Sequence, residues 1–257
     1  MAFWFSLVKS NDVKDKNLLS FNRILADDDD LRVVFLLFYV AILYHVALLM
    51  KAQSPALDLP ASVTFSGTGS KLINILTADN AALRELSQLV FERVLDKPYP
   101  AHTSLTVYTD PDQPKEATCK GALMMSVADQ QAQPKSVVFM GTADALAEPL
   151  TYGDLAKPDV AETLINDATA FFAFFFALNR DFDFQDNLNV SAYALKTARE
   201  QLNLNLMDYL KTGIQKKVED QQGDDAGQDK KVEEPLFFYP LIGAINRLVS
   251  TIGAKTN

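Results

Sequence analysis

The sequence contains very little cysteine and histidine: Cys119 is its single cysteine, and His45 and His102 are its only histidines. One cysteine excludes an internal disulfide, which fits a reducing compartment, and we expect Cys119 to be an inert, small apolar residue. Two histidines far apart in the chain provide no cysteine/histidine metal signature. We therefore predict a cytoplasmic protein and assign no metal site and no catalytic residue from the sequence.

Positive charge is also scarce, with 24 lysines and arginines against 33 aspartates and glutamates and a formal net charge of -9. No local cluster of basic residues reverses this balance, so the surface repels a phosphate backbone and nucleic acid is not an expected partner. Residues 1–9 are apolar but lack a preceding basic segment and a cleavage site, so we do not expect a signal peptide there. The apolar content of 48% is ample for a buried core.

One apolar run, Leu31–Met50, has the length of a bilayer span. Its flanks, the acidic stretch Asp27–Asp30 and the lone Lys51, do not fit a span anchored by a basic cluster, and the aspartates instead suit the positive end of a helix dipole. We favour a buried core helix over a membrane span, and a helix cap over a cation site at the aspartates. His45 within this helix is interpreted as a core or interface histidine rather than a catalytic base, because no carboxylate or nucleophile lies at helical spacing from it.

The segment after this helix combines strand and helix signals. Ser62–Phe65 is short and β-branched, which indicates a strand, and Leu72–Leu76 resumes an apolar helical pattern. Ala82–Leu95 predicts an amphipathic helix ending before Pro98, and Ser104–Tyr108 alternates as a strand does. A second helix is predicted from Pro114.

The remainder of the chain is mainly helical in pattern. Ser136–Met140 predicts one more strand, whereas Val160–Leu178 and Ala192–Val218 show long helical periods. The phenylalanines of the first helical segment predict core packing, with a surface covered by another subunit or by a missing half of the protein as the alternative. They are Phe171, Phe172, Phe174, Phe175 and Phe176.

The last part of the chain separates into a polar stretch and an apolar one. Residues 221–234 have the composition of a flexible linker, and the apolar positions in residues 235–257 form a terminal amphipathic helix. This helix either docks in a partner groove or packs back on its own domain.

A glycine loop joins the predicted strand to the helix after it. Gly67 and Gly69 permit positive φ and close approach, and a loop that opens a helix presents main-chain N–H groups to an anion or a nucleotide. The loop is neither a Walker A motif nor a dinucleotide fingerprint. Spacing alone leaves two readings open: a ligand-binding loop, or a tight turn without a ligand.

The order of these segments resembles the second half of the actin-like ATPase superfamily, which includes actin, Hsp70 and the sugar kinases. The motifs that carry the resemblance are Val-Thr-Phe-Ser-Gly-Thr-Gly-Ser-Lys at residues 63–71 and Pro-Lys-Glu-Ala-Thr-Cys-Lys-Gly-Ala-Leu at residues 114–123. It covers residues 27–125, and large bacterial actin-like or Hsp70-like proteins are the most similar. Thr68 stands where the family commonly has a second glycine, which would hold the ligand further away.

The resemblance implies a nucleotide-binding loop, with ATP or ADP as the ligand. Its residues are Ser66, Gly67, Thr68, Gly69, Ser70 and Lys71. It also implies that Lys115, Glu116 and Gly121 match the family structurally. Family members hydrolyse ATP with Asp-x-Gly loops placed after strands, and the only such sequence here, Asp225-Ala226-Gly227, lies in the predicted linker. The chain is therefore not expected to be a self-sufficient ATPase, and Mg²⁺ would bind only if the missing half is present. The expected partner is the missing N-terminal half or another protein chain, and a membrane is not an expected partner.

These expectations define a helix-rich α/β fold: a partial actin-like ATPase subdomain with a small mixed sheet, followed by a mainly helical C-terminal extension. The predicted units are an N-terminal remnant (1–26), the nucleotide-binding subdomain (27–145), the helical extension (146–220), the linker (221–234) and the terminal helix (235–257). The alternative functions are a helical interaction or scaffold module without a ligand and a membrane-associated protein using residues 31–50.

Overall fold

The computed structural model describes residues 29–53, 58–65, 73–77, 79–109, 150–151, 153–220, 232 and 235–253. In chain order the elements are α3 (Asp29–Gln53), β1 (Ser62–Phe65), α4 (Ile73–Leu76), α5 (Asn80–Leu95), β2 (Thr106–Thr109), η4 (Asp154–Ala156), α8 (Pro158–Phe182), α9 (Phe184–Leu188), α10 (Ala192–Leu202), α11 (Leu206–Asp220) and α12 (Phe238–Gly253). The helix-rich α/β class is confirmed for these residues, because helices dominate and the two strands form one small sheet.

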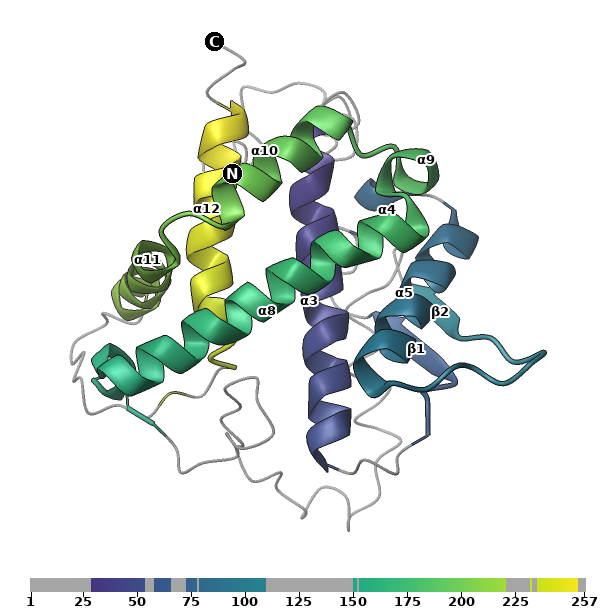
Figure 1. Cartoon of the computed structure of the whole chain (residues 1–257), viewed down its shortest axis with the longest axis horizontal. Helices are drawn as coiled ribbons and strands as arrows, with labels where there is room; N and C mark the ends of the chain where they lie inside the picture. Colours follow the sequence, from purple (N-terminus) through teal and green to yellow (C-terminus); the bar gives the residue numbers. More distant parts are fainter. Residues whose placement is uncertain are drawn as a thin grey trace, which may run out of the picture.

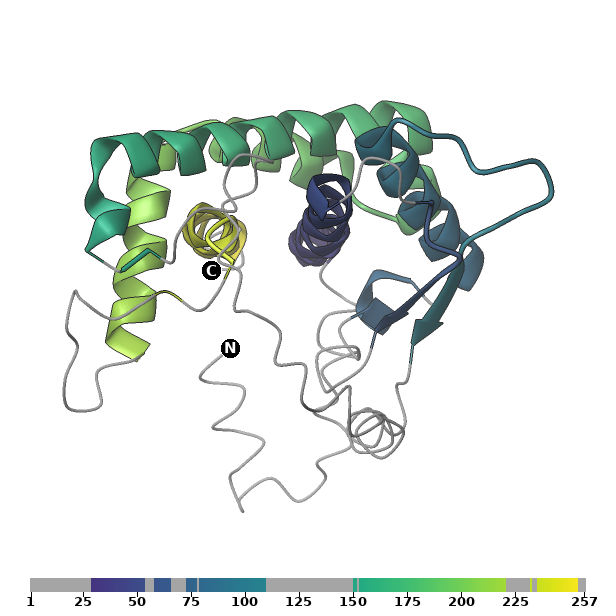
Figure 2. The same ribbon diagram turned by 90° about the horizontal axis from the view of Figure 1, so that it is seen from below.

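Helix α3 is the centre of the fold. Figure 1 shows it between α12 on one side and α5 with the two strands on the other, and Figure 2 shows α8 running along one side of both α3 and α12. Its apolar residues face neighbours in several directions, so Val33, Leu36, Val40 and Ala47 are fully buried. A helix that is apolar all round is buried in this way, and the interpretation of residues 31–50 as a core helix agrees with this packing.

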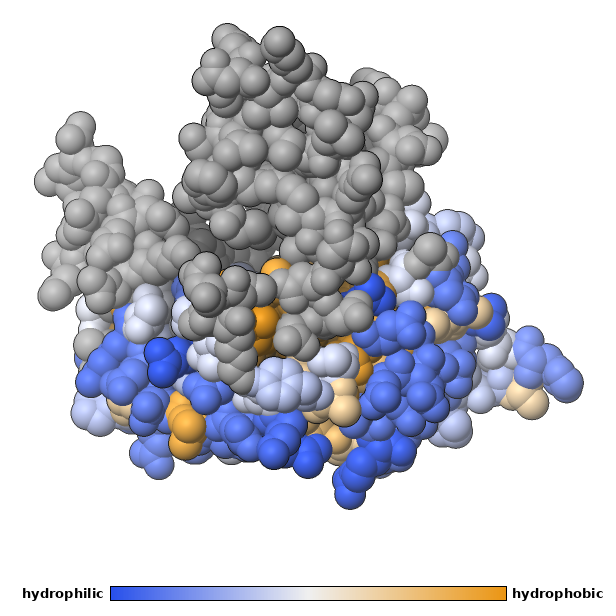
Figure 3. All heavy atoms as spheres, turned by 90° about the horizontal axis from the view of Figure 1, so that it is seen from above, coloured by the Kyte–Doolittle hydropathy of each residue, from blue (hydrophilic) through white to orange (hydrophobic). Residues whose placement is uncertain are grey.

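Within the part of the chain that the structure describes, two helices have the length and composition to cross a membrane, Leu31–Ala52 and Pro158–Phe182. The core helix of a soluble protein passes the same test, so this finding is weak support for a span. On the face drawn in Figure 3, the described surface is mostly hydrophilic, and hydrophobic residues show only in small areas.

Helix α5 forms where the amphipathic pattern predicted it and begins slightly earlier. Asp79 caps its N-terminus, because the side chain accepts a hydrogen bond of 2.7 Å from the amide of Ala81. Asp96 ends it in the left-handed conformation with φ 54°. At the same end the ammonium group of Lys51 donates to the carbonyl of Val94, which ties α5 to the end of α3.

Helix α8 extends the predicted segment 160–178 at both ends. Pro158 occupies the first turn, and Asp183 ends the helix in the left-handed region with φ 51°. Phe171, Phe172 and Phe175 are fully inaccessible to solvent, which confirms them as core residues.

The predicted helical segment 192–218 is divided into α10 and α11. Ser191 caps α10, and the chain then leaves the helix at Asn203 and takes φ 55° at Asn205. The Tyr209 hydroxyl donates to the carbonyl of Gln201 at 2.8 Å, so the last turn of α10 is bonded across the break to α11. A continuous apolar pattern could not reveal this turn, because both helices bury residues of the same type.

Helix α12 packs against its own domain, which was one of the two predicted alternatives. Its residues Leu241, Ala244 and Leu248 belong to the main core. Residues 221–231 of the predicted linker lie outside the described part, but Val232 is buried and its amide donates to the carbonyl of Leu150 at 2.7 Å. Val232 therefore anchors the chain before α12, and the linker at 221–234 stays a prediction.

Several predictions fall outside the described residues. They are the N-terminal remnant 1–26, the helix from Pro114 with Lys115, Glu116 and Gly121, Cys119, and the strand 136–140. A small mixed sheet was predicted, and the two described strands pair in parallel.

Candidate functional site

The candidate site is the carboxyl edge of the β1–β2 pair. The strands are parallel and in register, with Ser62 opposite Thr106 and Phe65 opposite Thr109. Both strands therefore end at the same edge. In open α/β sheets, ligands bind in the crevice outside the carboxyl ends of the strands, and the predicted loop begins at Ser66, directly after the last residue of β1.

The connection between the strands makes this edge possible. Parallel strands need a crossover, usually a helix, and here α4 and α5 supply it between β1 and β2. Helix α5 contacts α3 on one side and β2 on another. The described residues thus form a strand–helix–strand unit anchored on the central helix.

The sheet is attached to α3 through aromatic packing. The rings of Tyr39 and Phe65 stack with centroids 5.3 Å apart. The Tyr39 hydroxyl lies 2.7 Å from the Ser87 hydroxyl, and Ser87 donates in turn to the carbonyl of Leu83 at 2.6 Å. Burial raises the pKa of Tyr39 to about 12, so this residue stays a neutral hydrogen-bond donor. The last residue of β1 therefore rests on a rigid, buried support.

The opposite edge of the sheet is held by Tyr99. Its hydroxyl donates to the carbonyl of Pro60 at 2.9 Å, and its amide donates to the carboxylate of Glu92 at 2.8 Å. Burial, with the nearby Glu92 charge as a smaller cause, raises the pKa of Tyr99 to about 12. Structural bonds therefore occupy the amino end of the β1–β2 pair.

The face of the sheet away from α3 is open. Thr64 and Thr106 are exposed, and the Tyr108 side chain is 54% exposed, while Val63 and Val107 pack against the core. An exposed aromatic ring on a strand that ends at the candidate edge can stack on a planar ligand. The sequence predicted Tyr108 only as a strand residue. Its exposure depends on which face of the strand is turned to solvent.

The predicted ligand-binding residues Ser66, Gly67, Thr68, Gly69, Ser70 and Lys71 all lie outside the described part of the chain. The strand before them and the helix at Ile73 after them are present. The strand at 62–65 excludes a single uninterrupted helix over residues 62–76.

Comparisons of the chain with protein-family models, with curated proteins and with solved structures found no match. The function of the candidate site is therefore inferred from its geometry and its sequence.

His45 lies away from this edge, inside an aromatic cluster of α3, α8 and α12. It is 4% exposed and stacks on Phe237 with ring centroids 5.3 Å apart, and the ring of Phe238 meets it edge-on at 5.2 Å. Burial lowers the pKa of His45 to about 4, so the imidazole is neutral at pH 7. The interpretation as a core histidine is confirmed by this environment.

The tertiary structure brings a carboxylate to the same cluster that helical spacing could not reveal. Asp167 of α8 lies close enough to Tyr44 to raise the pKa of that hydroxyl, although burial is the larger cause. Within the described residues, the buried Oδ2 atom of Asp167 has no hydrogen-bond partner, and burial raises the pKa of this carboxyl to about 6. Helical spacing could not reveal that Asp167 lies near Tyr44, because α3 and α8 are more than 100 residues apart along the chain.

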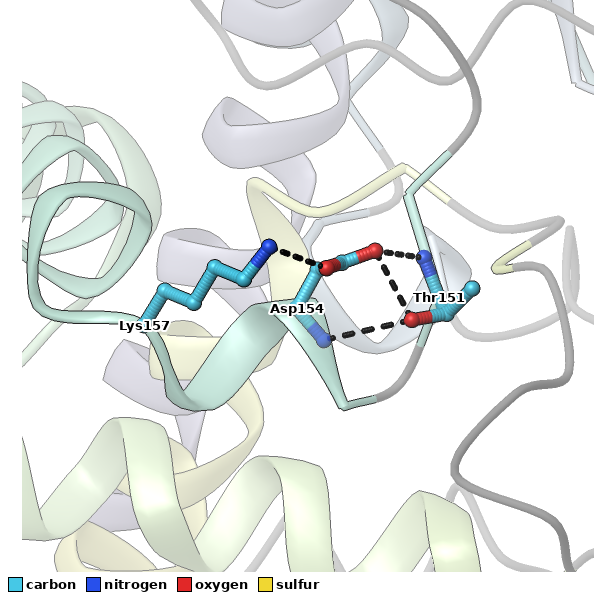
Figure 4. A network of polar contacts seen from close by, with 3 residues as sticks. All are labelled: Thr151, Asp154 and Lys157. Carbon is cyan, nitrogen blue, oxygen red and sulfur yellow. Dashed lines mark hydrogen bonds and ion pairs between the residues drawn. The ribbon is translucent and has the colours of Figure 1, made fainter.

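A polar cluster at the start of α8 has a structural role (Figure 4). The amide and hydroxyl of Thr151 both donate to Asp154 at 2.7 Å, and Lys157 pairs with the other carboxylate oxygen at 2.7 Å. These bonds hold the pKa of Asp154 well below its usual range; the hydrogen bond from Lys157 is the largest cause. All its carboxylate contacts serve the turn that leads into α8.

In the described part of the chain, no group of three or more histidine, cysteine, aspartate or glutamate side chains is placed to hold a metal ion. Of the acidic stretch before α3, Asp27 and Asp28 lie outside the described residues, and the helix begins at Asp29.

Proposed function

We propose that residues 58–109 form part of a nucleotide-binding subdomain of the actin-like ATPase type, with ATP or ADP bound by the loop Ser66–Lys71. The observation that supports it most is the parallel register of β1 and β2 across a helical crossover. It supports the proposal because the predicted glycine loop follows β1 directly in the sequence, and open α/β sheets bind ligands beyond the carboxyl ends of their strands. Within this proposal the protein is cytoplasmic.

The loop chemistry follows from its composition. Gly67 and Gly69 lack a Cβ atom, so the main chain can approach a nucleotide closely, and the amides of a loop leading into a helix attract a phosphate or bond the edge of a base. Lys71 adds a positive charge close to the helix that begins at Ile73. Hydrolysis and Mg²⁺ binding would require a missing N-terminal half or another protein chain, so we expect weak nucleotide affinity for this chain alone.

Calorimetry with ATP and Mg²⁺ tests this proposal. Gly67→Asp adds a side chain and a negative charge in the loop, so it should abolish the heat of binding that the native chain produces. Ser104→Asp is a matched control, because it places the same charge at the exposed amino end of β2. The proposal would be rejected if ATP bound neither to this chain nor to a longer chain that also includes the protein sequence encoded directly upstream.

A membrane role for α3 is a second candidate function. The segment Leu31–Ala52 has a mean hydropathy of 2.5, and Phe38 and Val46 on this helix are 41% and 39% exposed. Fractionation of cells followed by a carbonate wash separates the two functions. Retention of the protein in the washed membrane pellet supports the span, and its release into the soluble fraction supports the core helix.

An interaction module based on the terminal helix needs a different test from simple deletion. Phe237, Leu241 and Leu248 contribute to the main core, so removal of residues 236–257 would damage the fold and any partner complex together. Substitution of the exposed Val249 by aspartate leaves the core intact and is the suitable variant.

A further inference from the structure

A half-open cleft of about 380 Å³ lies where the end of α8, the short helix α9 and the first turns of α10 meet. Figure 1 shows these elements following one another at the upper right of the molecule. The volume falls within the range of about 300–1,000 Å³ that is typical of small-molecule sites. The residues used below are Phe176, Asn179, Asp183, Leu195, Lys196 and Arg199, all of which line the cleft.

Two basic side chains of α10 line this cleft. Lys196 and Arg199 are three residues apart, so they lie on the same side of the helix. Neither forms an ion pair with any residue in the described part of the chain. In a chain with a net charge of -9, two cations without a carboxylate partner make this cleft a local site for an anion.

Arg199 is held in place by an aromatic ring. Its guanidinium carbon lies 4.9 Å from the centroid of Phe176, which is within the range of a cation–π contact. A guanidinium group that contacts a ring in this way keeps N–H donors that can form bidentate bonds to a carboxylate. The arrangement therefore combines an apolar surface with oriented donors.

The remaining polar groups of the cleft decide which ligand charge it favours. The Asp183 carboxylate accepts bonds of 3.1 Å from the amides of Gln185 and Asp186, so it caps α9. The side-chain oxygen of Asn179 accepts from the amide of Phe184 at 2.9 Å, which leaves its NH₂ group to donate. Two cations and one capping carboxylate leave one excess positive charge, which matches a monoanion better than a dianion.

We propose that this cleft binds a small organic monocarboxylate. The apolar body of the ligand lies against Phe176 and Leu195, and its carboxylate accepts hydrogen bonds from Lys196 and Arg199. The cleft uses none of the residues of the nucleotide proposal, so the two proposals are tested independently.

Benzoate is the probe, with acetate as a carboxylate that lacks the apolar body and benzyl alcohol as a ring that lacks the charge. Two-dimensional NMR of the full chain should show shifts confined to the end of α8, α9 and α10, strongest with benzoate and reduced with added salt. Arg199→Gln and Lys196→Gln should each weaken benzoate binding by roughly tenfold, as expected for the loss of a charge-assisted bond. Both side chains are exposed, so the fold should be retained and circular dichroism can confirm it.

Lys211→Gln is the matched control, because it removes an exposed lysine from α11 outside the cleft and should leave benzoate affinity unchanged. The proposal is overturned if benzoate produces no shifts in the cleft. It is also overturned if acetate binds as tightly as benzoate, or if both glutamine variants bind benzoate as the native chain does.

Discussion

Tyr209 of α11 and Gly243 of α12 approach so closely that a Cβ atom on the glycine would lie 2.0 Å from the tyrosine carbonyl oxygen. The contact is reciprocal, because a Cβ atom on Gly213 would lie 2.0 Å from the carbonyl oxygen of Tyr239. The main chains of the two helices therefore touch at two points, which only glycine permits. This crossing holds the terminal helix on its own domain.

We expect Gly243→Ala to lower the free energy of unfolding by about 1–3 kcal/mol, since the new methyl group forces the helices apart and overpacks the crossing. Alanine has the higher helix propensity, so a loss cannot come from the helix itself. Urea unfolding measures the effect. Ser250→Ala on the exposed side of α12 should change stability by less than about 0.5 kcal/mol, and equal stability of Gly243→Ala and the native chain would refute the close crossing.

The buried hydroxyl pair of Tyr39 and Ser87 predicts unequal effects of two single substitutions. Ser87 uses its own proton to bond Leu83, so Tyr39 donates to Ser87. Tyr39→Phe removes a hydrogen bond at a cost of about 1 kcal/mol, whereas Ser87→Ala leaves a buried hydroxyl without its partner and costs about 1–3 kcal/mol.

The double variant supplies the control for this pair. Because both substitutions remove the same bond, their combined loss in thermal unfolding should be smaller than the sum of the single losses. Strict additivity would show that the hydroxyl groups do not interact.

His45 and Asp167 should make opposite contributions to stability as the pH changes. The folded pKa of His45 is lowered to about 4, so its contribution is present above pH 6.5 and is lost as the pH falls towards 4. The folded pKa of Asp167 is raised to about 6, so its contribution is present below pH 3.8 and is lost as the pH rises through 6. Between pH 4 and 6 the contribution of His45 to stability therefore increases with pH, while that of Asp167 decreases.

Replacing one of the two residues reveals the pH dependence of stability that the other contributes. Asp167→Asn should leave a chain that loses on the order of 3 kcal/mol between pH 6.5 and 4 through His45. His45→Phe should leave a chain whose stability falls as the pH rises over the same interval. Chemical unfolding at several pH values measures both, and the same pH profile in both variants would contradict the assignment.

Arg93 and Asp181 form an ion pair of 2.5 Å between α5 and α8, with side chains 54% and 38% exposed. Exposed pairs contribute about 0–1 kcal/mol and are screened by salt. We expect Arg93→Gln to lower stability by less than about 1 kcal/mol at low salt and to have no measurable effect in 1 M salt. A larger loss that persists in high salt would mean that the pair does more than join two exposed surfaces.

Local chemistry made several elements of this fold predictable. The short, β-branched segment Ser62–Phe65 predicted β1, because such residues favour strands. The apolar stripe with polar gaps in Ala82–Leu95 predicted α5, because this pattern reflects one helix face turned to a core. Helix α5 ends before Pro98 as expected, with Asp96 as its cap. The break between α10 and α11 was not predictable, since it depends on Asn205 taking a left-handed conformation within an otherwise helical composition.

The two candidate sites also differ in how far the sequence alone predicts them. The glycines at positions 67 and 69 mark a loop in the sequence alone, because few other residues permit such a backbone. The cleft of Lys196 and Arg199 could not be recognised, since it exists only where α10 folds against the end of α8.

The sequence by itself determined the type of most elements, because the period of apolar residues and the capping residues act over a few positions of the chain. The tertiary structure alone decided that the strands are parallel, that Asp167 lies near Tyr44, and that the terminal helix packs on its own domain. These relationships join segments far apart in the chain, and the free energy that selects them comes from burial and close packing between elements, which no local pattern encodes.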